Sequence, residues 1–129
     1  MNISQTFLFA GGVFHLAIAI FHLFFWRIFH WKEDLASLTH INRAVMQILN
    51  ICLTFLFYVA AYVSFFHAAE LISTPLGRTV LASIALFWIL RLILQFVFFG
   101  ARHRVSILFI FVFTVGAALY LIPFFWSLP

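Results

Sequence analysis

The chain has 129 residues, of which 67% are hydrophobic and only 8% are charged, and its mean hydropathy is +1.20. A water-soluble domain of this size exposes too much surface for such a composition, so the sequence predicts an integral membrane protein in contact with lipid. The net charge of +4 comes from basic residues that lie mainly at the ends of apolar segments, which indicates membrane topology and excludes nucleic acid as a partner.

Four apolar segments are each long enough to cross the hydrocarbon core, which takes about 20 helical residues. They predict transmembrane helices at about 5–29, 41–66, 79–100 and 105–126. Because the connections are short, consecutive helices should be antiparallel neighbours. We therefore expect a single all-α domain over 1–129, built as an up-down-up-down bundle of four transmembrane helices.

Chain-breaking and aromatic residues refine this picture. Pro75 and Gly77 are predicted to interrupt the chain between the second and third helices, and Pro123 to bend or end the last helix. Four amphipathic rings are expected at the membrane interfaces: Trp26, Trp31, Tyr120 and Trp126.

The basic residues also orient the bundle. Most of them flank the first and third connections, where the sequence has Arg27, Lys32, Arg43, Arg102 and Arg104. The second connection has only Arg78, which is opposed by Glu70. The excess of positive charge predicts that connections one and three are cytoplasmic and that both termini are extracytoplasmic. We expect the membrane to be a bacterial inner membrane.

The second predicted helix has a polar stripe on an otherwise apolar surface. At 100° per residue, five polar side chains fall on one narrow face: Arg43, Gln47, Asn50, Thr54 and Tyr58. Within lipid, such a stripe has to face other protein, water or a ligand.

Polar residues on two further helices lie at matching depths. At ~1.5 Å per residue from the cytoplasmic side, His22 and Gln95 match Gln47, and Arg91 matches Asn50. The sequence thus predicts one shared polar site within the bundle, and its candidate ligand-binding residues are Arg43, Gln47, Asn50, Arg91, Gln95, His22, His15, Thr54 and Tyr58.

Arg91 decides what this site should bind. An arginine near the middle of the membrane costs from ~2.5 to more than 10 kcal/mol, depending on the method. The three acidic residues, Glu33, Asp34 and Glu70, all lie in predicted loops, so none can neutralise it. We therefore predict a cationic, amide-rich cavity that binds an anionic or amphiphilic molecule such as a lipid, fatty acid, isoprenoid or quinone.

Two simpler interpretations stay open. The amides and histidines could serve only as hydrogen bonds between helices, each worth ~0.6 kcal/mol. Alternatively, the protein is an accessory subunit of a larger membrane complex.

A catalytic role is a further alternative, because histidine is suited to acid–base chemistry near neutral pH. His15 and His22 are the candidates, although no carboxylate, activated cysteine or serine–histidine pair completes a recognisable catalytic set. No pattern in the sequence identifies a cofactor.

The positions Arg43, Gln47, Asn50, Arg91 and Arg104 on a four-helix chain resemble the membrane-associated proteins of eicosanoid and glutathione metabolism. The resemblance implies glutathione or lipid chemistry in a homo-oligomer, a trimer. The chain departs from that family in lacking its glutamate on helix two and its tyrosines on helix three.

A haem or metal protein is the last alternative. Bis-histidine haem ligation needs two imidazoles at equal depth on facing helices, and no pair in the sequence provides them. A metal site at the cytoplasmic rim would draw on His30, His40, His103, Glu33 and Asp34, but their spacing is not diagnostic of one.

Overall fold

The computed structural model describes residues 2–127, and these are almost entirely helical. Four helices are long and apolar enough to cross a membrane: α1 (Ile3–Leu23), α4 (His40–Phe66), α6 (Pro75–Phe99) and α7 (Arg104–Trp126). The prediction of an all-helical chain with four helices long and apolar enough to span a membrane is therefore confirmed. The short elements between them are α2 (Phe25–Ile28), α3 (Trp31–Asp34), η1 (Leu35–Ser37) and α5 (Ala68–Ser73).

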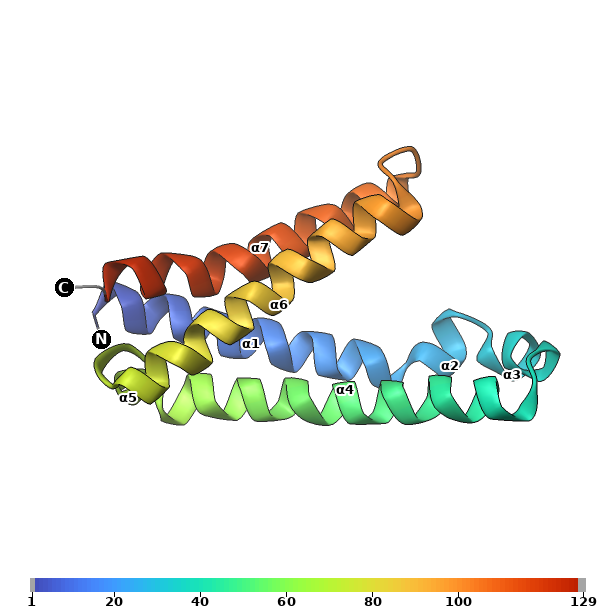
Figure 1. Ribbon diagram of the computed structural model, residues 1–129, viewed down its shortest axis with the longest axis horizontal. Helices are drawn as coiled ribbons and strands as arrows, with labels where there is room; N and C mark the ends of the chain where they lie inside the picture. Colours follow the sequence, from blue (N-terminus) through green and yellow to red (C-terminus); the bar gives the residue numbers. More distant parts are fainter. Residues whose placement is uncertain (1, 128–129) are drawn as a thin grey trace.

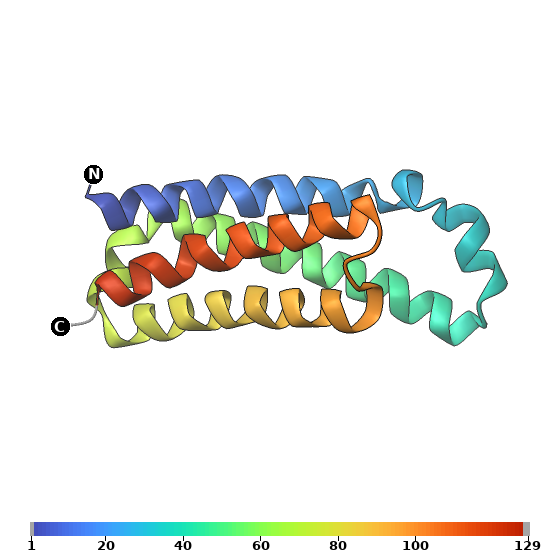
Figure 2. The same cartoon turned by 90° about the horizontal axis from the view of Figure 1, so that it is seen from above.

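The long helices pack as two pairs, α1 with α4 and α6 with α7. The pairs meet at the end of the molecule that holds α5 and the two ends of the chain, and they diverge toward the end that holds α2, α3 and the α6–α7 turn (Figure 1). Seen from above, α7 lies between α1 and α6 (Figure 2), and it contacts both of them. We call the two ends the closed half and the open half.

The first long helix is shorter than predicted. It ends at Leu23 rather than near residue 29, because the chain turns at Phe24 before the single-turn helix α2. A second change of direction follows at His30, whose backbone is left-handed with φ 49°. This break could not be predicted from the sequence, because the residues on both sides of Phe24 are apolar.

The third long helix begins earlier than predicted, and the interpretation of Pro75 and Gly77 as breaks within the connection was wrong. Pro75 occupies the first turn of α6, where its missing N–H costs nothing, and the Thr74 hydroxyl caps the helix by accepting from the Gly77 amide at 2.9 Å. Gly77 lies inside the helix against α5. A β-carbon there would be 2.0 Å from the carbonyl oxygen of Glu70, so only glycine permits this close packing.

A buried chain of hydrogen bonds joins all four long helices in the closed half. The Trp88 indole of α6 donates to Nε2 of His15 on α1 at 3.1 Å. On its other side, Nδ1 of His15 lies 2.8 Å from the hydroxyl of Tyr120 on α7, which is 2.8 Å from the hydroxyl of Ser64 on α4. All four side chains are almost completely buried. Tyr120, which was predicted to lie near a membrane interface, is therefore enclosed within the bundle.

The chain of bonds fixes the state of the histidine. An indole N–H can only donate, so Nε2 of His15 must accept and the ring is neutral with its hydrogen on Nδ1. That hydrogen faces the Tyr120 hydroxyl and the carbonyl oxygen of Gly11, 3.1 Å away. Both ring nitrogens are thus used by the protein itself, and His15 acts here as a packing residue.

Candidate ligand-binding cavity

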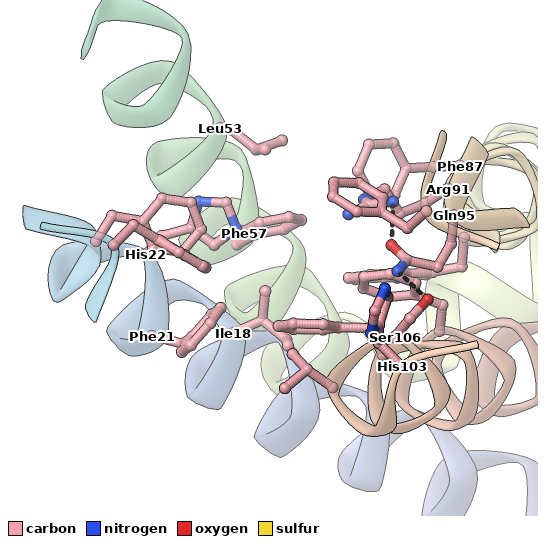
Figure 3. A pocket seen from close by; sticks show the side chains of 17 residues that line it. Ile18, Phe21, His22, Leu53, Phe57, Phe87, Arg91, Gln95, His103 and Ser106 are labelled. Atoms are coloured by element: carbon pink, nitrogen blue, oxygen red, sulfur yellow. Dashed lines mark hydrogen bonds between the residues drawn. The ribbon is translucent and has the colours of Figure 1, made fainter. Parts of the chain in front are cut away.

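A cavity of about 360 Å³ lies between the diverging helix pairs. Side chains of α1 and α4, such as Phe21, His22 and Phe57, form one wall. Arg91 and Gln95 of α6 face them across the cavity (Figure 3). Half of the remaining lining residues are phenylalanines. We call this space the polar cavity.

Arg91 is the charged group of the polar cavity. Its Nη1 donates to Oε1 of Gln95 at 3.2 Å, and its guanidinium carbon lies 4.2 Å from the ring centre of Phe113, which is a cation–π contact. Gln95 in turn donates to the Ser106 hydroxyl at 3.0 Å, and that hydroxyl donates to the carbonyl of Gly100. This relay orients the guanidinium but supplies no negative charge.

No acidic side chain in residues 2–127 pairs with Arg91; the ion pair found there joins His67 and Glu70 at 3.6 Å. Arg91 precedes the end of α6 at Phe99 by about two turns, or about 12 Å. The guanidinium is therefore within the span, only half-buried and in contact with the cavity. A cation in this position attracts an acceptor that carries negative charge.

His22 presents a second polar group to the cavity. Its Nδ1 donates to Oδ1 of Asn50 at 2.8 Å, and Nδ2 of Asn50 donates back to the His22 carbonyl at 3.2 Å. The ring stacks on Phe25 with a centroid distance of 4.2 Å. Asn50 therefore positions His22 and holds α1 against α4, while the imidazole lines the polar cavity.

The structure does not bring Arg43 together with Arg91. The Arg43 guanidinium donates to the carbonyl oxygens of the connection before α4: to Leu35 at 2.8 Å, to Ala36 at 3.0 Å and to Leu38 at 3.3 Å. It does not line the polar cavity. Arg43 thus stabilises the α3–α4 connection.

Five other predicted residues also lie outside the lining, among them His15, whose ring is bonded in the closed half. Asn50 acts through His22, and Thr54 is buried with its hydroxyl donating to the Asn50 carbonyl at 2.7 Å. Gln47 is half-buried on α4, and Tyr58 is exposed on the same helix. Of the predicted set, the polar cavity therefore contains His22, Arg91 and Gln95.

Sequence reasoning missed Ser106 as part of this site and assigned His103 only to a rim. Both line the polar cavity. The sequence does contain a signal for Ser106, which is a polar residue in the first turn of an apolar helix. The short connection before it folds α7 back onto α6, and this brings Ser106 next to Gln95. Reading the two helices as a hairpin would have paired them.

A second cavity, of about 380 Å³, lies between α4 and α6 in the closed half. Leu53, Phe57 and Phe87 line both cavities, so the two adjoin. We call the second space the apolar cavity. His15 also reaches it, although both of its ring nitrogens are already bonded.

The alternatives from sequence find little geometric support. Within residues 2–127, no group of three or more His, Cys, Asp or Glu side chains could hold a metal ion, so the proposed rim site does not assemble. Of the five positions that carry the resemblance to the eicosanoid and glutathione family, only Arg91 lines the cavity. No protein-family model matches the chain, and no curated protein or solved structure matches it significantly.

Proposed function

We propose that the protein binds a membrane amphiphile with an anionic head group, and that Arg91 holds this head in the polar cavity. The observation that carries the proposal is the guanidinium of Arg91, which lies inside a membrane span, faces a cavity and is bonded only to a neutral amide within residues 2–127. A carboxylate or phosphate accepts hydrogen bonds from a guanidinium and also neutralises its charge, whereas an amide does only the first.

The apolar lining suits the rest of such a molecule. Small-molecule sites have volumes of roughly 300–1,000 Å³, mostly apolar walls and a few polar groups that set the orientation. The polar cavity has this character, since phenylalanines surround Arg91, Gln95 and His22. A hydrocarbon chain leaves the bilayer for such walls at little cost, because lipid tails and apolar side chains are similar environments.

We further propose that the bundle is antiparallel, with connections one and three in the cytoplasm of a bacterial cell and both termini outside. The excess of Lys and Arg at these connections supports this orientation. The polar cavity, which extends to His103 in the α6–α7 turn, would then lie in the cytoplasmic half of the membrane.

The proposal is tested by changing only the head of the ligand. Protein stripped of lipid in a non-ionic detergent is titrated with hexadecanoate and with hexadecanol, and bound molecules are counted by native mass spectrometry. A hydrogen bond to a charged group contributes about 1.5–3 kcal/mol, so the acid should bind about 10- to 100-fold more tightly than the alcohol.

The matched variant is Arg91→Gln, which keeps a polar side chain and removes the charge. It should bind the acid and the alcohol with similar affinity. Equal binding of the two by the unmodified protein would refute the proposal.

A further inference from the structure

The polar and apolar cavities adjoin between α4 and α6, where Leu53, Phe57 and Phe87 line both of them. The rings of Phe57 and Phe87 stand where they adjoin, 5.8 Å apart and nearly perpendicular. Phe57 is buried in the core, whereas Phe87 is exposed. A molecule that extends from one cavity to the other therefore passes beside Phe87.

The apolar cavity offers hydrocarbon surface and no free hydrogen-bonding side chain. Its two hydroxyls are already engaged, since Ser83 donates to the Thr79 carbonyl at 2.8 Å and Thr79 donates to the Pro75 carbonyl at 3.0 Å. His15 is engaged through both nitrogens. Because every polar group on its walls is paired within the protein, this cavity is suited to an alkyl chain.

The position of the head sets the direction of the chain. Beyond Arg91 toward the α6–α7 turn, the sequence places Arg102, His103 and Arg104, all of them exposed. These groups are unfavourable neighbours for a hydrocarbon tail. In the other direction lies the apolar cavity, which shares Phe87 and Leu53 with the polar cavity as lining residues.

On the basis of the function proposed above, we propose that the ligand is a single-chain anionic amphiphile whose chain passes Phe87 and ends in the apolar cavity near Thr79. Arg91 and Thr79 are about 18 Å apart along α6 at about 1.5 Å per residue. A saturated chain with bonds of about 1.5 Å and angles of about 111° advances about 1.25 Å per bond. The path therefore accommodates about 14 carbon–carbon bonds, the length of a long-chain fatty acid.

The test maps both ends of the chain with two photoreactive hexadecanoates, one with a diazirine near the carboxylate and one with a diazirine near the methyl end. Each probe is irradiated with the full-length protein in non-ionic detergent, and the labelled residues are identified by mass spectrometry. The first probe should label walls of the polar cavity such as Phe21 and Phe109. The second should label the apolar cavity at Leu56, Ala60 or Ser83.

A filled cavity provides the matched control. Ala60→Phe places a ring in the apolar cavity and should reduce labelling by the methyl-end probe at least fivefold, while labelling by the first probe is retained. Ala17→Phe makes the same change at an exposed position of α1 outside both cavities and should alter neither. The labelling map of the unmodified protein decides the question even if a variant does not fold.

The outcomes separate this inference from the proposed function. One outcome is that the first probe labels the polar cavity, Arg91→Gln abolishes that label, and the methyl-end probe labels residues outside the apolar cavity. The proposed position of the chain is then refuted, while the binding of the head group by Arg91 is supported. If neither probe labels either cavity in a manner that depends on Arg91, both proposals are overturned.

Discussion

The two histidines of α1 lie two turns apart on one helix and differ in what surrounds them. His15 in the closed half has both ring nitrogens bonded to Trp88, Tyr120 and the Gly11 carbonyl. His22 in the open half is held by Asn50 through Nδ1, and its ring lines a cavity. A polar side chain within a span thus stabilises the fold where all of its hydrogen-bonding groups have partners in the protein. Where they do not, the side chain is available to a ligand.

The two arginines inside the predicted polar site show the same difference. Arg43 donates to three backbone carbonyls of a connection, whereas Arg91 donates to one neutral amide and faces the polar cavity. Both side chains are half-buried. Their partners, rather than their burial, distinguish a structural arginine from a candidate binding residue.

The largest expected effect is on the closed half. Gly77→Ala would place a β-carbon 2.0 Å from the backbone oxygen of Glu70, so α5 and α6 must separate. We expect the free energy of unfolding to fall by about 3 kcal/mol, as measured by thermal unfolding in detergent. Gly12→Ala is the matched control with a smaller effect, because the three atoms nearest to its new β-carbon belong to the movable ring of Phe65. Equal stability of Gly77→Ala and the unmodified protein would contradict the close packing described here.

The second-largest expected effect is a difference in stability between variants of the two histidines. His15→Leu leaves the buried indole of Trp88 and one side of the Tyr120 hydroxyl without a partner, and we expect a loss of about 2 kcal/mol in the free energy of unfolding. His22→Leu removes only the pair with Asn50 and should cost about 0.6 kcal/mol. If both variants lose a similar free energy of unfolding, the hydrogen bonds of His15 in the closed half do not stabilise the fold more than those of His22 in the open half.

The smallest effect concerns Arg43. Arg43→Gln removes the hydrogen bonds to the connection around 35–38 and should lower the free energy of unfolding by about 1 kcal/mol or less. Limited proteolysis should cleave this connection faster than in the unmodified protein, while the spanning helices stay intact. Unchanged cleavage would mean that these bonds do not order the connection.

Composition and the lengths of the apolar runs were enough to predict four spanning helices, because a helix is the simplest way to satisfy backbone hydrogen bonds in lipid. The spacing of four residues on one helix face was enough to place Gln95 near Arg91. Neither could show that α1 ends at Leu23, since the residues after it are as apolar as those before.

The candidate site was harder to predict because partners depend on packing between helices. A helical wheel places Arg43 and Asn50 on the same stripe and gives no reason to expect different roles for them. It cannot show that Arg43 turns back to the carbonyls of a connection, or that Asn50 is used by His22. The burial of Tyr120 could not be predicted for the same reason, since its partners His15 and Ser64 are on other helices.

The most direct test of the account compares the affinity for hexadecanoate of Arg91→Gln and Arg43→Gln, two variants with the same change of charge. We expect Arg91→Gln to bind at least about tenfold more weakly than the unmodified protein, as loss of a charge-assisted hydrogen bond implies, and Arg43→Gln to bind within about twofold of it. If both variants weaken binding equally, or if Arg91→Gln binds as tightly as the unmodified protein, Arg91 is not the site of the anionic head.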